Sequence, residues 1–490
     1  MGPRRGAAVA VAGGALLLLW PAFLNGYPLV FSDTGAFLEQ TAAAFPVWDK
    51  PMVYGPLLHA FHWRATLWGP AAAQALLLSW LLWLAARMGR RETPDAAAAG
   101  HVLLVAALCI GTAAPWFASL LMPDVLAPAL VLAVAVLGWG APGPVVHAGL
   151  LLVVVLAAAS HLAHLPLPAA LLLPLADLRR WRGLRDGAAA LLAALALLVA
   201  TNAVFQGRAA VSPYGAVFAL ARVVADGPGA RTVEARCPDA GWHLCRWAGR
   251  LPADSDEFLW SGDGPAWAPR LDGAQPGGPI SFAPEAVVVL RETLAREPWA
   301  VLVAAAANTA RQLAAAQVGD TLGPDHLPAS VAVQLALAFP PAEGERLAGS
   351  LQFRGALPAV AAPLLRPHLP VLLAAALALP FAAWGASRRG DAPLFGLLLC
   401  AAVGVVANAA ATGALSGPHD RYGARIAWLL PFGVLLAWRR RGFLAGRARD
   451  RRGSAIACWP RLRLSGAPGA SSTVAVAAPD PPLPGGTAAP

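Results

Sequence analysis

Charged side chains are scarce in this sequence. Asp, Glu, Lys and Arg make up 13% of the 490 residues, whereas soluble domains carry roughly 25%. Lysine is almost absent, because Lys50 is the only one among the 37 basic residues. Hydrophobic residues reach 58%, and apolar runs of about 20 residues, the length that crosses a bilayer, recur along the chain. The composition excludes an ordinary soluble domain and predicts an all-α integral membrane protein.

Several motifs are also missing. The sequence has no GxxxxGK[ST] nucleotide loop, no GxSxG elbow and no HExxH pair, so it lacks the signatures of P-loop ATPases, serine hydrolases and zinc proteases. The alternating pattern of a membrane β-barrel is absent as well. The net charge of +10 comes from arginines that cluster beside the apolar runs. This is the positive-inside bias, so we expect membrane lipid and not nucleic acid as the partner.

The apolar runs and their flanking arginines predict about ten transmembrane helices. Arg4 and Arg5 place the N-terminus on the cytoplasmic side, and Arg439 to Arg441 place the C-terminus there too. We expect a multi-pass protein of the bacterial inner (plasma) membrane whose first helix is not cleaved. The predicted spans are about 6–24, 70–88, 101–121, 125–139, 145–159, 167–178, 187–205, 369–386, 393–415 and 426–438.

This topology divides the chain into four parts. Residues 1–205 form a seven-span module with a long first outer loop at 25–69, and residues 369–441 form a three-span module. Between them, 206–368 is a polar outer (periplasmic) region, and 442–490 is a basic and then disordered cytoplasmic tail. Within the outer region, we expect 286–318 to form interfacial helices because one face is polar. The alternative is a pair of crossings over 299–318 and 327–340.

The first outer loop supplies the first candidate site residues. Asp33 is a candidate general base or ligand at the outer end of the first span, and the alternative is a helix N-cap in SDTGAFLEQ. Glu39 is a candidate substrate ligand or a solvated side chain. Lys50 and Tyr54 are candidate substrate-binding residues in DKPMVYG.

The remaining outer connections contribute further polar residues. Asp124 lies in the short connection MPD and is either a second catalytic carboxylate or a helix cap. His161 and His164 are candidate substrate-binding residues. They are spaced to share a helical face and could bind a metal, or they are simply hydrogen-bonded at the interface. Four tryptophans near span ends are typical of an interfacial aromatic belt: Trp63, Trp68, Trp116 and Trp428.

The motif HDRYGAR precedes the last span. It contains His419, Arg421 and Arg425, and the two arginines are four residues apart, so they share a face if a helix already begins there. Arginine suits phosphate because its planar guanidinium donates two parallel hydrogen bonds. Arginines beside a span are expected on the inner side, but these two fall on the outer side. They are therefore candidate phosphate ligands, and the alternative is that they anchor the helix at the interface.

Cysteine is rare, with five residues in the chain. Cys237 and Cys245 lie close together in the polar outer region, and they could form a disulfide if that region faces an oxidising compartment.

The order of these motifs resembles the GT-C superfamily of membrane glycosyltransferases, which includes protein mannosyltransferases and aminoarabinose transferases. An acid follows the first span in NGYPLVFSDTGAFL, a second appears in LMPD, and HDRYGAR precedes the last span. The resemblance implies transfer of a sugar from a polyprenyl-phosphate donor to an acceptor on the outer face of the membrane. Asp33 would then be the base, Asp124 would orient the acceptor or hold a divalent cation, and Arg421 and Arg425 would stabilise the leaving phosphate.

Two other functions fit the same sequence. A lipid or glycolipid transporter or flippase would explain the spans and the outer charges without a chemical step. A non-catalytic envelope assembly protein would use 206–368 as a binding surface. Transporters often place ionisable residues at mid-membrane, whereas here the predicted spans are nearly free of charge.

Overall fold

The computed structural model describes residues 3–90, 92–269 and 277–440. Over these ranges the chain is helical and forms no strand, apart from an isolated bridge between Leu29 and Leu120. The described residues form one compact unit. The predicted tail at 442–490 lies outside the described residues.

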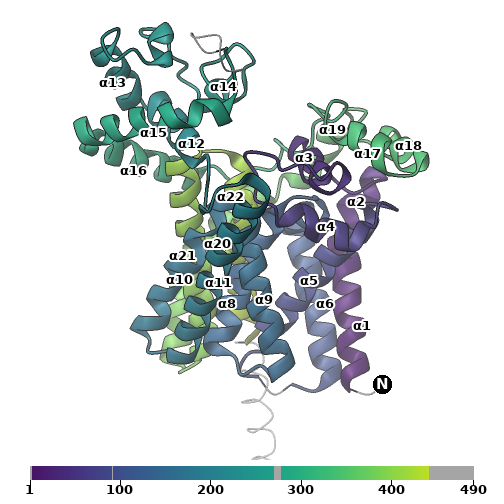
Figure 1. Ribbon diagram of the computed structural model, residues 1–490. Helices are drawn as coiled ribbons and strands as arrows, with labels where there is room; N and C mark the ends of the chain where they lie inside the picture. The colour runs from purple at the N-terminus through teal and green to yellow at the C-terminus, as the bar shows by residue number, and fades with distance from the viewer. Residues whose placement is uncertain (1–2, 91, 270–276, 441–490) are drawn as a thin grey trace, which may run out of the picture. The chain divides into compact units, whose positions relative to one another are not determined.

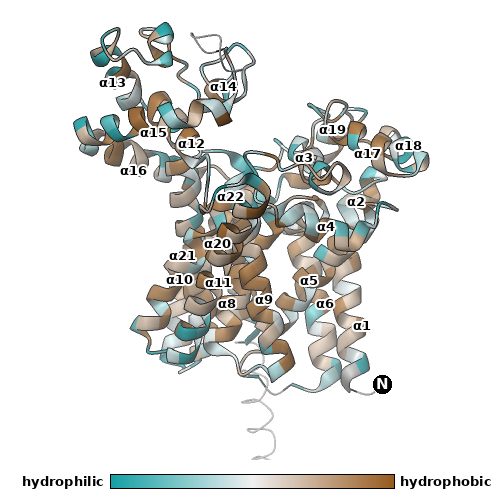
Figure 2. Ribbon diagram, viewed as in Figure 1, coloured by the Kyte–Doolittle hydropathy of each residue, from teal (hydrophilic) through white to brown (hydrophobic). Residues whose placement is uncertain are grey.

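Five helical stretches are long and apolar enough to cross a membrane. Figure 1 shows the long helices of this unit running roughly side by side, and Figure 2 shows them mainly in the brown of hydrophobic residues. The five are α5 (Trp68–Arg87), α6 (Pro94–Gly111), α11 (Trp181–Gln206), the stretch Leu357–Arg388, which includes α19 (Leu357–Leu365) and α20 (His368–Arg388), and α21 (Ala392–Leu415).

Shorter apolar helices pack among these five. The contacts between α1 and α6, between α8 and α9, and between α8 and α21 join them into one bundle around a shared hydrophobic core. Helix α8 is buried along almost its whole length. The shorter helices are α1 (Pro3–Leu18), α8 (Leu126–Trp139), α9 (Pro144–Ser160) and α10 (Pro166–Asp177). The part of the chain that the structure describes is therefore all-helical, with five membrane-length helical stretches.

The third predicted span, 101–121, is not one continuous helix. Helix α6 ends at Gly111, and a separate short helix, α7, covers Ala114–Ser119. Thr112 causes the break, because its hydroxyl donates to the Leu108 carbonyl at 2.7 Å and accepts from the Ala114 amide at 3.2 Å. These local bonds compete with the helical pattern, as threonine side chains often do. The chain after Thr112 then turns into α7, which leads to the segment that carries Asp124.

The first outer loop forms two short helices, α3 (Ser32–Ala42) and α4 (Tyr54–His62), and the short helix α2 (Trp20–Asn25) leads into it after α1 ends. Helices α3 and α4 pack against each other. The Phe37 and Tyr54 rings meet edge to face with centroids 4.8 Å apart, a favoured arrangement for aromatic pairs.

The region after α11 builds a second, smaller hydrophobic core. Its buried residues come mainly from α12 (Gly215–Ala225), α14 (Ser255–Trp260) and α15 (Pro279–Arg296), with α13 (Pro228–Arg236) and the 3-10 helix η3 (His243–Trp247) packed beside them. Cys237 and Cys245 are joined by a disulfide within this region, with Cα atoms 5.3 Å apart.

Helix α16 (Pro298–Ala314) leaves this smaller core and packs against α21. It covers much of the region predicted to hold interfacial helices. Further along lie α17 (Val331–Ala338) and α18 (Pro341–Gly349), and α17 packs against α3. Neither α16 nor α17 belongs to the five membrane-length helices found among the described residues. The last labelled helix is α22 (Asp420–Ala427), and helical residues continue over 429–440.

Candidate functional site

Backbone contacts join the first two outer connections. The Leu29 amide donates to the Ser119 carbonyl, and the Leu121 amide donates to the Leu29 carbonyl, both at 2.9 Å. The Thr34 hydroxyl adds a hydrogen bond to the Leu121 carbonyl at 3.0 Å. The start of α3, which carries Asp33, is therefore fixed beside the segment that leads into the 3-10 helix η1 (Pro123–Val125), which carries Asp124.

A buried glutamine connects the first outer loop to a third segment. Gln352 is fully buried. Its amide nitrogen donates to the carbonyls of Val30 and Thr321 at 2.7 and 2.9 Å, and its oxygen accepts from the Val30 amide at 3.1 Å. Thr321, next to Asp320, is thereby joined to Val30 in the first outer loop. Gln352 uses both ends of its amide, as a buried polar group must.

The HDRYGAR motif is held from two sides. The Gln312 side chain of α16 donates to the His419 carbonyl at 2.8 Å and accepts from the His419 amide at 2.9 Å. The Asp420 carboxylate accepts from the Gln317 amide at 2.9 Å. At Gly423 a side chain would meet the Ala315 carbonyl oxygen at 1.9 Å, so this close approach requires glycine.

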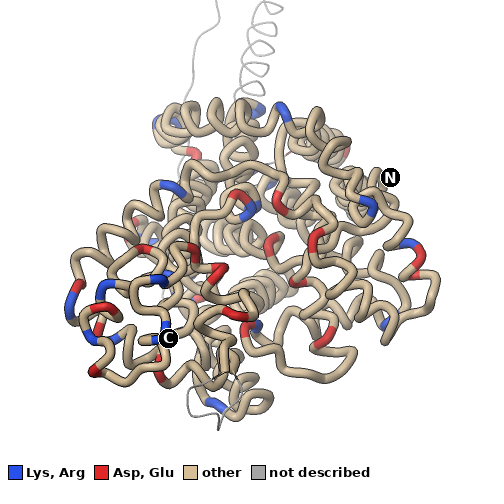
Figure 3. Tube along the Cα trace, turned by 90° about the horizontal axis from the view of Figure 1, so that it is seen from above, with Lys and Arg blue, Asp and Glu red and all other residues tan. Residues whose placement is uncertain are grey.

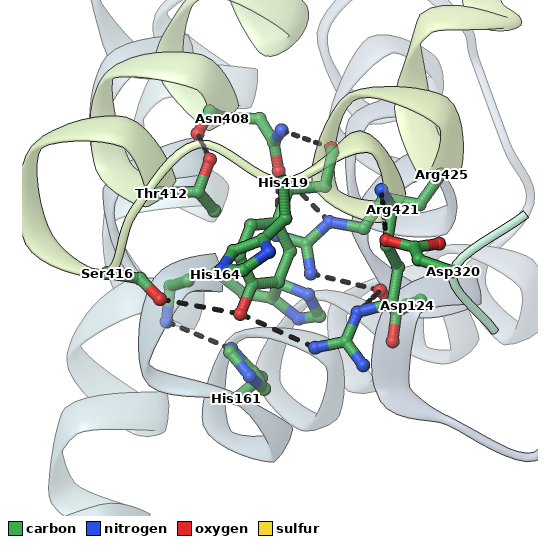
Figure 4. A network of polar contacts seen from close by, with 12 residues as sticks. Asp124, His161, His164, Asp320, Asn408, Thr412, Ser416, His419, Arg421 and Arg425 are labelled. Atoms are coloured by element: carbon green, nitrogen blue, oxygen red, sulfur yellow. Dashed lines mark hydrogen bonds and ion pairs between the residues drawn. The ribbon is translucent and has the colours of Figure 1, made fainter. Parts of the chain in front are cut away.

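Asp124 is the acid at the centre of a buried network that Figure 4 shows from close by. Its Oδ1 lies 3.3 Å from Arg425 Nη1 and 3.8 Å from Arg421 Nε. The Asp124 carboxylate is 2% exposed and the Arg425 side chain is fully buried. Arg425 also donates from Nε and Nη2 to the Asn408 oxygen of α21 at 3.2 and 2.8 Å. Burial of this ion pair requires such additional hydrogen bonds to offset the loss of water.

Arg421 lies on the same face of α22 as Arg425, but its surroundings differ. Its guanidinium lies over the Phe31 ring at 4.6 Å and over the Tyr422 ring at 5.0 Å, which are cation–π contacts. Its side chain is only 10% exposed. Nη2 donates to the Tyr422 hydroxyl at 3.4 Å, whereas Nη1 is buried and has no hydrogen-bond partner among the described residues. Arg421 therefore keeps a donor for an anion, while Arg425 is occupied.

Asp33 shares the ammonium group of the single lysine. Lys50 Nζ lies 3.0 Å from Asp33 and 2.5 Å from Asp49. The Asp33 side chain keeps 32% exposure, against 11% for Lys50. Burial raises the pKa of Asp33, but Lys50 and Arg421 lower it by more, so it lies below the ordinary value. Seen from above, acidic and basic segments are interspersed in the central part of Figure 3, as these pairings require.

Neither Asp33 nor Asp124 is the residue that caps its helix. The N-cap of α3 is Phe31, and the Thr34 hydroxyl accepts from its amide at 2.9 Å, so Asp33 is not the cap. The N-cap of η1 is Met122, so Asp124 is not the cap of that helix. Both carboxylates pair with cations, and neither is the N-cap residue, although each lies in the first turn of its helix.

The two histidines lie side by side but do not form a metal site. The His161 and His164 rings have centroids 5.2 Å apart, and each ring has one nitrogen bonded to the local backbone. Burial, with the charges of Arg425 and Arg421, lowers the pKa of His161 to about 3. No group of three His, Cys, Asp or Glu side chains within the described ranges could hold a metal ion.

Three other candidates lie around this centre. Tyr54 is buried and donates to the Gln74 side chain at 2.5 Å. His419 points toward Asp256 of α14, 3.6 Å away, and its side chain is 42% exposed. Glu39 lies on α3, half-buried. The sequence predicts all of these residues for one site. In the structure, the network consists of Asp33, Asp124, Lys50, Arg421 and Arg425, and the other three candidates lie around it.

Four further residues belong to the network: Asp320, Gln352, Asn408 and Tyr422. The carboxylate of Asp320 accepts from the Arg421 amide at 3.0 Å, and burial raises its pKa. Asn408 is a lone amide within an apolar span, which is a signal that the sequence carries. Asp320 and Gln352 have no such signal, because they lie in polar segments rich in similar residues.

The network thus combines the partly exposed carboxylate of Asp33, the ammonium group of Lys50 and the guanidinium of Arg421, which has an unused donor. Such a set can bind an anion at Arg421 and accept a proton at Asp33. Comparison of the chain with models of known families, with curated proteins and with solved structures finds no match.

Proposed function

We propose that this chain is a membrane glycosyltransferase of the GT-C type, which moves a sugar from a polyprenyl-phosphate donor to an acceptor on the outer face of the bacterial inner membrane. One observation carries the proposal. Arg421 Nη1, a buried cationic donor without a partner, lies in the same network as a partly exposed carboxylate, Asp33. A phosphate ester and a hydroxyl acceptor are the two groups that this pair would recognise.

Asp33 is the base in this proposal. Its lowered pKa keeps it ionised at neutral pH, so it is ready to accept the proton of the acceptor hydroxyl as that oxygen attacks the anomeric carbon. The C–O bond to the phosphate breaks as the new glycosidic bond forms. The same low pKa makes Asp33 a weak base in the resting state, so its bond with Lys50 must loosen during proton transfer.

Arg421 stabilises the leaving phosphate. Negative charge grows on the phosphate oxygen as the glycosidic bond breaks, and a fixed cation at that position lowers the barrier. Lys50 pairs with two carboxylates, and its ammonium group can exchange one of these contacts for a contact with the same phosphate. Arg425 has a different role from the one expected from sequence, since it holds Asp124 and Asn408 and thereby fixes the helix that carries Arg421.

The membrane arrangement in this proposal uses about ten crossings, with both termini cytoplasmic. The five membrane-length helices and the shorter apolar helices packed with them provide the bundle. The candidate residues then lie on the outer side, where a lipid-linked sugar is available and a nucleotide sugar is not. This places the donor phosphate at the headgroup level, beside the short helices of the first outer loop.

The rival function is a lipid or glycolipid flippase. A flippase needs a path for a charged headgroup through the bundle, which ionisable residues usually mark. The network described above is instead gathered around α3, η1 and α22, next to the outer loops. This supports a reaction at one face over movement between two.

The test uses the purified full chain in nanodiscs and a panel of polyprenyl-phosphate monosaccharides with labelled sugar. Asp33→Asn should lower transfer by about a hundred- to ten-thousand-fold, the usual contribution of a general base. Glu345→Gln, which changes an exposed acid on α18, should transfer at the wild-type rate. Full activity of Asp33→Asn would refute the base. Wild-type protein that flips fluorescent lipid in vesicles but transfers no sugar would favour the flippase.

A further inference from the structure

Helix α16 has its polar and apolar faces in the opposite arrangement to a surface helix of a soluble domain. Asn308 and Gln312 are 0% and 1% exposed. The Asn308 amide donates to both carboxylate oxygens of Asp226 at 3.0 and 2.9 Å, and Gln312 bonds to the His419 backbone at both ends of its amide. A soluble surface helix buries its apolar stripe and turns its polar face to water. In α16 the polar face makes the protein contacts instead.

The opposite face of α16 is apolar and exposed. Trp299 is 77% exposed and Val303 is 67% exposed. The exposed apolar side chains recur every three or four residues, which is the spacing of a single helical face. This outward face of α16 consists of Trp299, Leu302, Val303, Ala306, Ala310 and Leu313. Because all six side chains are apolar, water is an unfavourable surrounding for the face.

Helix α16 is attached to two of the stretches that are long and apolar enough to cross a membrane. It packs against α21, where a side chain at Gly413 would meet the Asn308 carbonyl oxygen at 2.7 Å, so the two backbones approach closely. Just after α16, the Ala316 carbonyl accepts from His368 Nε2, at the start of α20, at 2.9 Å. Helix α20 exposes an apolar stripe of its own, made of Leu369, Leu373, Leu377, Phe381 and Trp384. Exposed apolar side chains therefore continue from a membrane-length stretch to the helix beside it.

Lipid fits the outward face better than a protein partner does. A second copy of the chain would need to cover about 800 Å² on each partner to form a standard stable interface, which is more than this single row of side chains provides. The row also lacks any charged or hydrogen-bonding side chain at which a partner could be oriented. Acyl chains need no such group, and they adapt to the convex surface of a helix.

We propose that α16 lies in the outer leaflet of the membrane, with its outward face among the acyl chains and its polar face holding the start of the HDRYGAR motif. Its 17 residues span about 25 Å at 1.5 Å per residue, and it is not among the membrane-length helices of the described ranges. The sequence predicts an interfacial helix here because one face is polar, and the structure turns that face to the protein. The inference uses the outer location of α16 but not sugar transfer, so the two proposals succeed or fail separately.

The first experiment reports the surroundings of the outward face. An NBD fluorophore is attached to Val303→Cys in a Cys458→Ser background, in which the two remaining free cysteines are buried. The full chain is reconstituted in nanodiscs. The fluorophore should emit at shorter wavelength than in water, should be quenched by spin-labelled lipid and should escape quenching by iodide. Leu373→Cys, on the exposed stripe of α20, is the lipid-facing reference, and Glu345→Cys, on α18, is the water-facing reference.

Three results would overturn the proposal. Iodide quenching as strong as at Glu345→Cys would place the face in water. Protection from iodide without quenching by lipid would assign the face to a second copy of the chain. Stronger quenching by a spin label at the end of the acyl chain than by one near the headgroup would indicate a helix that crosses the membrane. The expected result is the reverse order, with the strongest quenching near the headgroup.

The second experiment places a charge on the face. Val303→Glu would bring a carboxylate among the acyl chains, which is costly, so its midpoint of thermal unfolding in nanodiscs should fall below that of wild type. Val303→Ala keeps the face apolar and should lower the midpoint less. Ala342→Glu, at an exposed position of α18, should leave the midpoint unchanged. Equal midpoints for Val303→Glu and Val303→Ala would contradict contact between this face and lipid.

Discussion

Asp124 and Arg425 are 301 residues apart in sequence, yet Asp124 Oδ1 accepts a hydrogen bond from Arg425 Nη1 at 3.3 Å in a fully buried setting. The pair joins the second outer connection to the start of the last helical segment. Arg425 completes its hydrogen bonding on Asn408, so its charge has no route to water. The position of Arg421, one turn earlier on α22, depends on this contact.

The first prediction concerns the stability that this pair provides. Asp124→Ala should destabilise the protein by about 3–5 kcal/mol, because it leaves the Arg425 charge buried without its acid. The measurement is thermal or denaturant unfolding of the purified protein in detergent. Glu297→Gln, which removes a partly exposed partner of Arg231, should change stability little.

A double variant distinguishes the effect of losing the ion pair from the effect of losing side-chain volume. Asp124→Leu with Arg425→Met replaces the ion pair by apolar side chains and should recover much of the stability lost in Asp124→Ala. The double variant should still lack transfer activity, since α22 no longer holds Arg421 through the same contacts. An Asp124→Ala protein as stable as wild type would show that the pair does not anchor α22.

The second prediction concerns Arg421 and the donor phosphate. Arg421→Gln should weaken binding of a polyprenyl phosphate about 10- to 100-fold, the equivalent of about 1.5–3 kcal/mol for a hydrogen bond to a charged group. Arg421→Lys should recover only part of the affinity, because lysine cannot donate two parallel hydrogen bonds. Binding is measured with a fluorescent polyprenyl phosphate.

The matched control is Arg346→Gln. Arg346 is an arginine of α18 that pairs with Glu343 and is 58% exposed, so its removal should leave lipid affinity within about twofold of wild type. Equal loss of affinity in the two variants would indicate a general effect of positive charge and would contradict a specific phosphate site at Arg421.

The third prediction is a shift of the pH–rate profile. The pKa of Asp33 lies below its ordinary value because Lys50 and Arg421 outweigh the effect of burial. Its carboxylate therefore stays ionised to lower pH than an ordinary aspartate does, and activity that depends on it falls only in strongly acidic solution. Lys50→Gln removes one cation, so the pKa of Asp33 should rise and the acid limb of kcat/KM should move to higher pH.

The stability of the protein gives an independent check on the direction of this pKa shift. Stability linked to a lowered carboxyl pKa is present above the unfolded pKa and is lost as the pH falls through the folded pKa. Lys50→Gln should therefore become sensitive to acid at a higher pH than wild type in both unfolding and transfer. An acid limb that stays in place in Lys50→Gln would assign the base to another group.

Much of this arrangement could be predicted from the sequence, because it depends on short stretches of the chain and not on contacts between distant ones. Apolar runs define the long helices, because a helix in lipid must satisfy its own backbone. Asp33, Asp124 and Arg421 stand out because charge is rare in such a chain. The break at Thr112 was missed, because a side chain that bonds to its own backbone does not alter the average hydropathy of the run.

Other features depend on tertiary contacts and have no local signal. Trp116 and Trp428 were predicted for an interfacial belt, but both are buried, with 2% and 0% exposure. Tryptophan packs equally well in a core, so its position near a span end does not decide between the two. The link from Val30 through Gln352 to Thr321 spans more than 300 residues of sequence and could be found only in the folded chain.

The last prediction uses Lys50 as a natural probe, because it is the only lysine. Burial lowers its pKa, but Asp33 and Asp49 raise it by more, so the amine stays protonated and is a poor nucleophile. An acylating reagent should modify Lys50 slowly in the folded protein and rapidly after unfolding. Asp33→Asn removes one of the two carboxylates at Nζ and should accelerate acylation severalfold, whereas Asp95→Asn, in the first turn of α6, should not. The extent of labelling is read by mass spectrometry of the single lysine-containing peptide. Rapid acylation of folded wild type, or equal rates in the two variants, would mean that the Asp33–Lys50 ion pair does not persist in solution.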